Sequence, residues 1–237
     1  IFMKNNEILV KDLGVLSYDK SWEHQKRIFD NIVSQKINNR TLKKKIKTEN
    51  YLLIVEHKPI YTIGKSGEIS NLLLDDQELK LKGIDFREIN RGGDITFHGL
   101  GQIVGYPILD LDNFFTDIGL YLRTLEEVII STIGFFGIKG FRIDGETGVW
   151  VKDESNSLKK ICAFGIKASR WVTMHGFALN VNTDLTYFDN IVPCGISDKG
   201  VTSLQEILNQ KISPKTVKEK LYENFARLFN AELSMTN

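Results

Sequence analysis

Cysteine is the residue type in this chain whose settings best suit covalent chemistry. The sequence holds two, Cys162 and Cys194. Within residues 191–196 (IVPCGI), a proline precedes Cys194 and a glycine follows it, which predicts a turn rather than a strand. A turn cysteine in a reducing compartment is a candidate nucleophile, because the thiolate attacks and a turn gives it access, although many such cysteines are inert. Cys162 stands in an apolar, strand-like stretch, so we expect it to be a small core residue.

A second unusual stretch covers residues 91–102 (RGGDITFHGLGQ). Its four glycines would let the backbone approach a ligand closely and would offer amide N–H groups to an acyl or oxyanion group. Arg91 supplies a charge and His98 a titratable ring within it. From the residues alone, this stretch is as consistent with a tight hairpin as with a binding site.

Residues 160–182 (KICAFGIKASRWVTMHGFALNVN) form the third unusual stretch. They predict a β-hairpin in which polar side chains interrupt an apolar alternation. These side chains are Lys160, Lys167, Arg170 and His175. A lone histidine such as His175 is more often a satisfied structural residue than a catalyst, so its role stays open at this point.

The totals exclude several classes of function. The 237 residues are 42% hydrophobic, enough for a sizeable core, and include 31 basic and 30 acidic residues. The formal net charge of +1 gives no global field that would select nucleic acid or an anionic membrane. The basic run at residues 40–47 is expected in a solvated loop, with docking of an acidic partner as the alternative. Two cysteines without C-x-x-C spacing predict neither a disulfide framework nor a zinc site, and no metal is expected.

Two glycine patterns resemble nucleotide-binding motifs but fail in detail. Residues 59–66 (PIYTIGKS) resemble a P-loop, but Pro59 stands where that motif needs its first glycine. Gly99, Gly101 and Gly105 miss the dinucleotide spacing by one residue and precede a predicted strand instead of a helix. The chain also lacks a G-x-S-x-G elbow and an H-E-x-x-H motif.

Hydrophobic periodicity predicts the elements that would position these residues. Helices are expected over residues 18–37, 75–82 and 116–136, and in the C-terminal region from Ser213, with Pro214 at the first helical position. Strands are expected over residues 8–15, 51–56, 60–63, 84–89, 102–111, 138–143, 148–152, 160–167 and 172–181. One α/β domain (α+β type) over residues 1–237 fits best, with a mixed β-sheet flanked by helices.

In order, these stretches resemble the lipoyl(octanoyl) transferases, a family of the biotin/lipoate protein ligase superfamily. The resemblance rests on EHKPIYTIG at residues 56–64, RGGDITFHGLGQIVGYPI at 91–108, GVWV at 148–151, the 160–182 block, and PCGI with VTSL at 193–196 and 201–204. It spans roughly two-thirds of the chain. It implies a biotin/lipoate protein ligase-like fold. The sequence departs from the family pattern at Phe97, where tyrosine is usual, and at Leu100, where proline is usual.

By motif, the resemblance implies that Cys194 and Lys160 form a catalytic pair, with neighbouring Lys159 as the alternative lysine. It also implies three segments around the acyl chain. The first contains Arg91, Gly92, Gly93, Asp94, Ile95, Thr96, Phe97 and His98; the others are Ala163, Phe164 and Gly165, and Gly176, Phe177 and Ala178. His175 and His98 are possible accessory residues with a structural role as the alternative.

The resemblance further implies a reaction that needs no cofactor, because a thioester donor already carries the activation. The expected donor is octanoyl-acyl carrier protein. The expected acceptors are lysines in lipoyl domains of 2-oxoacid dehydrogenase complexes and in the glycine cleavage H protein. No nucleic acid or membrane partner is expected. The first residues resemble neither a signal peptide nor a transit sequence, and we expect a cytoplasmic protein.

Three other functions remain open at this stage. An ATP-dependent lipoate or biotin protein ligase would share the fold and the lysine, but an acyl-adenylate has no need of a turn cysteine. A non-catalytic module that sequesters acyl or lipoyl groups would need neither Cys194 nor Lys160. A cysteine–histidine hydrolase would share the acyl-enzyme step and use water in place of a lysine.

Overall fold

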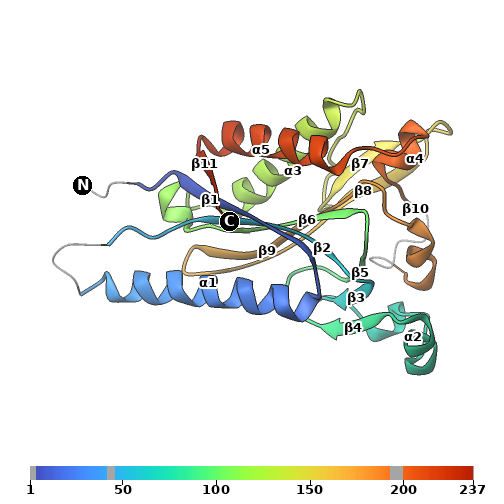
Figure 1. Cartoon of the computed structure of the whole chain (residues 1–237), viewed down its shortest axis with the longest axis horizontal. Helices are drawn as coiled ribbons and strands as arrows, with labels where there is room; N and C mark the ends of the chain where they lie inside the picture. The colour runs from blue at the N-terminus through green and yellow to red at the C-terminus, as the bar shows by residue number, and fades with distance from the viewer. Residues whose placement is uncertain (1–3, 42–45, 193–199, 237) are drawn as a thin grey trace.

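The computed structural model describes residues 4–41, 46–192 and 200–236. Within these residues the chain forms a mixed α/β fold (Figure 1). The strands are β1 (Glu7–Leu16), β2 (Tyr51–His57), β3 (Ile60–Ile63), β4 (Asp85–Glu88), β5 (Ile95–His98), β6 (Gln102–Ile108), β7 (Val149–Lys152), β8 (Leu158–Ser169), β9 (Val172–Asn180), β10 (Gly200–Val201) and β11 (Glu232–Met235). The α-helices are α1 (Tyr18–Asn38), α2 (Asp76–Lys82), α3 (Ile118–Gly134), α4 (Leu204–Leu208) and α5 (Pro214–Phe229). Short 3₁₀ turns are η1 (Ile69–Asn71), η2 (Leu111–Asn113) and η3 (Leu185–Asn190).

The described strands form two sheets. The larger has the order β10-β8-β9-β6-β2-β1-β11, with β7 also paired to β8, and the smaller has the order β4-β3-β5. Pairings β8–β9, β9–β6 and β6–β2 are antiparallel, whereas β2–β1, β1–β11 and β10–β8 are parallel. The sheet is therefore mixed, as predicted.

Helices cover both faces of the large sheet. Helices α3 and α5 lie on one face and α1 on the other (Figure 1). Strand β2 shows why: Leu52 and Ile54 belong to the α3–α5 core, while Leu53 and Val55 belong to the α1 core. A strand buried on both faces has a continuous apolar run in place of alternation, as YLLIV does.

Local sequence determines where the helices begin and end. Helix α5 begins after Ser213, whose side chain accepts a hydrogen bond from the Thr216 amide. Helix α2 has a capping box between Asp75 and Glu78 and ends at Gly83 in the left-handed conformation. The beginning of α5 was predicted from Ser213 and Pro214, whereas α2 was predicted only as the range 75–82.

Most predicted elements are confirmed within one or two residues at their ends, but some differ. The predicted strand at 138–143 is wrong: only a single bridge joins Phe141 to Trp150, because a turn at Asp144 and Gly145 follows directly. The predicted strand at 102–111 ends at Ile108, since the next two amides donate to the side chains of Thr173 and Asn50. Strands β5, β10 and β11 and helix α4 were not predicted.

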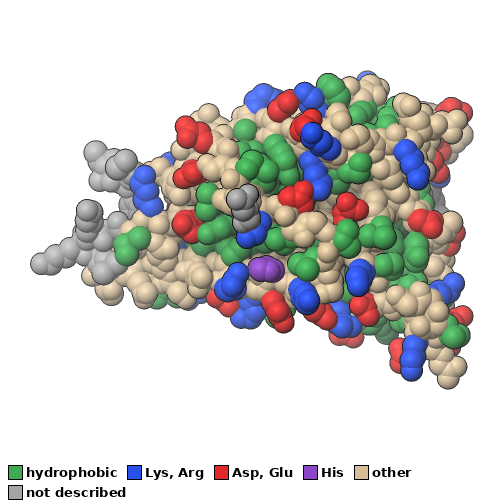
Figure 2. Space-filling model, viewed as in Figure 1, with side chains coloured by type: hydrophobic (Ala, Val, Ile, Leu, Met, Phe, Trp, Pro, Cys, Tyr) green, Lys and Arg blue, Asp and Glu red, His purple; other side chains and the backbone are tan. Residues whose placement is uncertain are grey.

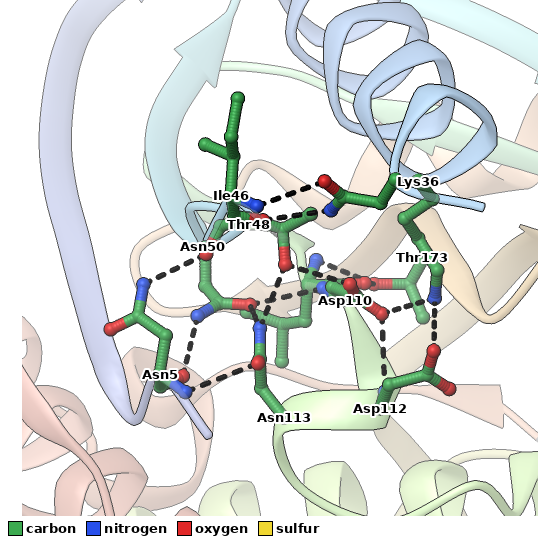
Figure 3. A network of polar contacts seen from close by, with 11 residues as sticks. Asn5, Lys36, Ile46, Thr48, Asn50, Asp110, Asp112, Asn113 and Thr173 are labelled. Carbon is green, nitrogen blue, oxygen red and sulfur yellow. Dashed lines mark hydrogen bonds and ion pairs between the residues drawn. The ribbon is translucent and has the colours of Figure 1, made fainter. Parts of the chain in front are cut away.

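A buried polar network lies at the end of α1 (Figure 3). Asp110 is 4% exposed and forms an ion pair with Lys36. Its carboxylate also accepts from the Thr48 hydroxyl at 2.7 Å, and its amide donates to Asn50 at 3.0 Å. The network joins the end of α1 to the chain before β2 and after β6, so it fixes these segments around the sheet.

Lysine, arginine and acidic side chains alternate over the face in Figure 2, which agrees with the net charge of +1. Among the described helices, none is both long enough and apolar enough to cross a membrane.

Candidate functional site

A cavity of about 300 Å³ lies between the β8–β9 hairpin and the strands β5 and β6. Its walls are largely apolar, with a smaller number of polar groups, which is the usual character of a small-molecule site. The apolar lining consists of Ile95, Val104, Ala163, Phe164, Phe177, Ala178, Phe188 and Val201. An apolar chain therefore fits this cavity better than a charged molecule.

The structure brings most of the predicted site residues to this cavity. Of the residues predicted by resemblance or as accessory, those lining it are Arg91, Gly93, Asp94, Ile95, Thr96, His98, Lys160, Ala163, Phe164, Gly165, His175, Gly176, Phe177 and Ala178. Cys194 falls outside the described residues. The chain on either side of residues 193–199 is described at Val192 and Gly200.

Two members of the predicted 91–98 segment have other contacts. Phe97 is 1% exposed and stacks on Tyr187 at 4.5 Å, within the core beneath the small sheet. The Gly92 amide donates to the Ile166 carbonyl at 3.0 Å. The hairpin alternative for residues 91–102 is not found, because β5 pairs with β3 whereas β6 pairs with β2 and β9.

Arg91 holds the 91–98 segment against the small sheet. Its Nη2 donates to the carbonyl and the hydroxyl of Thr62, at 2.8 and 3.0 Å, and its Nη1 donates to the Gly92 carbonyl at 3.1 Å. The side chain is only 7% exposed. The guanidinium thus acts as a bridge between β3 and the loop that leads into β5.

Glycines let this segment lie directly against the β8–β9 hairpin. A Cβ on Gly165 would meet Cδ of Arg91 at 2.7 Å and the Gly92 carbonyl oxygen at 2.9 Å. A Cβ on Gly176 would meet the Gly105 carbonyl oxygen at 2.1 Å. Side chains at these two positions would push apart the backbones that form the cavity walls.

A chain of hydrogen bonds connects His98 to the strand that carries Lys160. The Gln102 side-chain nitrogen donates to the backbone carbonyl of Phe97 at 3.1 Å and to the side-chain oxygen of Asn180 at 2.9 Å. Its oxygen is left to accept from Nδ1 of His98 at 2.8 Å, so that nitrogen carries the proton. The Asn180 side-chain nitrogen in turn donates to the Thr202 carbonyl at 3.0 Å, and the Thr202 amide donates to the backbone carbonyl of Lys160 at 3.0 Å.

The histidines at the cavity are neutral. Burial, reinforced by nearby His57, lowers the pKa of His98 to about 3. Burial and the positive charge of Arg91 lower the pKa of His175 to about 3. Neither ring carries a charge near pH 7, so neither would repel an apolar ligand.

Sequence reasoning missed an aromatic cluster at the same end of the cavity. Tyr18 and Tyr106 both line the cavity. His57 packs 5.3 Å from the Tyr18 ring and 5.7 Å from the His98 ring, and its Nε2 accepts from the Tyr106 hydroxyl at 2.7 Å. Burial lowers the pKa of His57 to about 4. These residues come from α1, β2, β5 and β6, so only the folded sheet brings them together.

Lys160 lies at the other end, six residues along β8 from the position paired with His175. At about 3.3 Å per residue the two ends are roughly 20 Å apart along the strand. Gly145, Glu146 and Thr147 line the cavity beside Lys160. The alternative lysine, Lys159, instead has its ammonium 3.9 Å from Asp153.

The strand that follows the 193–199 segment pairs with the same part of β8. Gly200 is opposite Lys159, and Val201 is opposite Lys160. Val201 also lines the cavity. The described chain therefore returns from this segment beside Lys160.

Within the described residues, no group of three His, Cys, Asp or Glu side chains could hold a metal ion. Cys162 is fully buried in the α3–α5 core, as predicted, and burial raises the pKa of its thiol well above the usual value. A thiol in that state is a poor nucleophile.

Comparison with known sequences identifies close relatives. Residues 17–226 match the family described as the lipoyl protein ligase A/B catalytic domain. The chain is 57% identical to the octanoyltransferase of Christiangramia forsetii, over 97% of this chain and 98% of that protein. It is 55% identical to the octanoyltransferase of Flavobacterium johnsoniae, over 97% and 99%.

Solved structures of low sequence identity share the fold. P. falciparum LipL1 in complex with lipoate has a TM-score of 0.71 at 17% identity, covering 96% of this chain and 66% of that one. A bipartite lipoate protein ligase from Thermoplasma acidophilum has a TM-score of 0.67 at 17% identity, covering 100% and 88%. The predicted lipoate protein ligase-like fold is therefore confirmed.

Proposed function

The chain belongs to the octanoyltransferases of the lipoyl protein ligase A/B family, and we propose that it carries the octanoyl group as a thioester on Cys194. It is an acyltransferase of protein lipoylation, with lipoyl domains as acceptors. The donor in this proposal is octanoyl-acyl carrier protein. The acceptors include lipoyl domains of 2-oxoacid dehydrogenase complexes and the glycine cleavage H protein. The observation that carries the proposal is that Lys160 and the predicted acyl-contacting segments line one apolar cavity.

In the first half-reaction, the Cys194 thiolate attacks the donor thioester carbonyl. A free thiol has a pKa of about 8.5 and is only a few per cent thiolate near neutral pH. The Lys160 ammonium stabilises the thiolate electrostatically. When the tetrahedral intermediate collapses, the bond to the phosphopantetheine sulfur breaks, and Lys160 gives its proton to that leaving thiolate.

In the second half-reaction, the ε-amine of an acceptor lysine attacks the Cys194 thioester. Lys160, now neutral, takes a proton from the attacking nitrogen. The carbon–sulfur bond breaks, an amide forms, and the Cys194 thiolate is regenerated beside the Lys160 ammonium. Atoms and protons balance over the two steps without a nucleotide.

The backbone near Gly165 and the 91–98 segment are the candidate donors for the oxyanion. Each such donor typically contributes about 10²–10³-fold in rate. The Gly92 amide already donates to Ile166, which favours other amides of the segment for this task. The apolar walls between Lys160 and His175 receive the octanoyl chain. A catalytic thiol requires a reducing environment, so we propose a cytoplasmic location.

The test is mass spectrometry after incubation with octanoyl-acyl carrier protein in the absence of ATP. We expect one octanoyl group to be attached to Cys194. This adduct should disappear when a lipoyl domain is added. The Cys194→Ser variant should form no octanoyl adduct that a lipoyl domain can remove. Lipoyl-domain modification that requires ATP and free octanoate would instead indicate a ligase and would overturn the proposal.

Matched variants test which lysine and which cysteine take part in the reaction. Lys160→Met should slow adduct formation by at least 100-fold, the typical contribution of a positioned acid–base group. Lys159→Met should leave the rate near that of the native enzyme, because Lys159 faces Asp153. Cys162→Ala should still form the adduct, since Cys162 lies in the core. A native rate in Lys160→Met would remove that residue from the mechanism.

A further inference from the structure

The side chain of Lys160 is confined by a neighbouring strand. Trp150 on β7 is the direct cross-strand partner of Lys160 on β8. The Lys160 Nζ lies 4.6 Å from the centroid of the Trp150 ring. The ring is only 2% exposed, so its position is fixed by packing. This is the geometry of a cation–π contact, and tryptophan is the best aromatic partner for an ammonium.

A second contact restricts the aliphatic part of the same side chain. A Cβ on Gly148 would meet Cε of Lys160 at 3.1 Å, so the lysine passes directly over this glycine. Gly148 has a φ of +145°, and its amide donates to the Glu126 carboxylate at 3.0 Å. Glu126 is fully buried on α3. The start of β7, which supports Lys160, is therefore anchored to helix α3.

We propose that Trp150 is a positioning residue that holds the ammonium of Lys160 at the cavity wall for proton exchange. This inference rests on the proposed function, in which Lys160 serves two sulfurs and one nitrogen in turn. A free lysine side chain samples many rotamers, and each misplaced conformer lowers the fraction of enzyme ready to react. The ring face reduces this loss without forming a hydrogen bond that the proton transfer would have to break.

The experiment compares Trp150→Leu and Trp150→Phe in single-turnover acylation by octanoyl-acyl carrier protein. We expect Trp150→Leu to slow acylation by about 3- to 30-fold, the range of a cation–π contact, with an unchanged KM for the donor. Trp150→Phe retains a weaker aromatic face, so it should slow acylation measurably but less than Trp150→Leu does. Val151→Ala, a buried change on the same strand that faces the α3–α5 core, controls for lost stability.

A double-mutant cycle separates positioning from a merely structural effect. If Trp150 acts through Lys160, Trp150→Phe should slow the native enzyme but should have no further effect in the Lys160→Met background. Equal slowing in both backgrounds, or a native rate in both Trp150 variants, would overturn the inference. If Lys160→Met itself acylates at the native rate, the proposed function fails first, so the two failures are distinguishable. Trp150→Phe keeps the cycle decisive even where Trp150→Leu does not fold.

Discussion

The Glu126 carboxylate is fully buried, yet it is surrounded by donors. It accepts from Arg123 at 2.7 Å, from Arg142 at 3.1 Å and from the Gly148 amide at 3.0 Å. A buried carboxylate is tolerated only when it is paired and hydrogen-bonded in this way. Because Gly148 packs on Lys160, Glu126 connects the stability of α3 to the geometry of the cavity.

Glu126→Gln should destabilise the protein and also slow acylation. The amide keeps the size of the side chain but removes the charge that the two arginines face. We expect a loss of about 2–4 kcal/mol in the free energy of unfolding, measured by urea denaturation. Glu127→Gln is the matched control: Glu127 also pairs with Arg142, at 2.7 Å, but its side chain is 41% exposed. That change should cost less than about 1 kcal/mol. Equal losses in the two variants would contradict this account of Glu126.

At the scale of elements, the β8–β9 hairpin carries backbone strain at its tip. Arg170 and Trp171 have φ values of +52° and +64°, both in the left-handed region. Two such residues are characteristic of a type I′ turn, which matches the twist of the strands but favours Asn-Gly. The hairpin accepts this strain because its two strands stay paired from Cys162 to Ser169, which fixes their register. That register places Gly165 opposite Gly176 at the cavity.

Arg170→Asn should relieve part of the strain and stabilise the protein. Asparagine tolerates the left-handed conformation better than arginine, so we expect a gain of about 0.5–1 kcal/mol in the free energy of unfolding. Arg170 is exposed and lies at the far end of the hairpin from Lys160, so acylation should be unaffected. Arg170→Ile is the opposing control, because a β-branched residue resists positive φ and should destabilise. A stability lower than native in Arg170→Asn would show that the arginine side chain itself stabilises the tip.

Elements with strong local signals were predictable, and contacts across elements were not. The apolar stripe of α3 and the Ser213 cap of α5 determine those helices from nearby residues alone. Strand β5 was missed because glycines on both sides make its four residues read as part of a loop. The pairing of Trp150 with Lys160 depends on the register of β7 against β8, which no local pattern encodes. The 91–98 and 160–182 stretches were recognisable because their composition itself is unusual.

At the scale of the whole molecule, three of the four histidines are buried as neutral rings. His57, His98 and His175 join α1, the small sheet and the large sheet around the cavity. Their folded-state pKa values, about 4 for His57 and about 3 for each of the other two, lie below the ordinary 6.5. In the unfolded chain these rings take up protons as the pH falls below 6.5, while in the folded protein they stay neutral.

The stability of the folded protein should therefore fall as the pH decreases from about 6.5 towards 4. Where the unfolded state binds more protons, the free energy of unfolding rises with pH. Each proton contributes about 1.4 kcal/mol per pH unit, so three rings give a slope of at most about 4 kcal/mol per unit. Carboxylates contribute little above pH 5, which makes the interval from pH 6.5 to 5 specific to histidine.

Urea denaturation across this interval measures the slope of the free energy of unfolding against pH. His57→Asn should reduce this slope by the contribution of about one proton, whatever its effect on absolute stability. A flat profile between pH 6.5 and 5 would mean that the cavity admits protonated histidines, and it would also remove the argument that this end of the cavity is uncharged when an octanoyl chain enters.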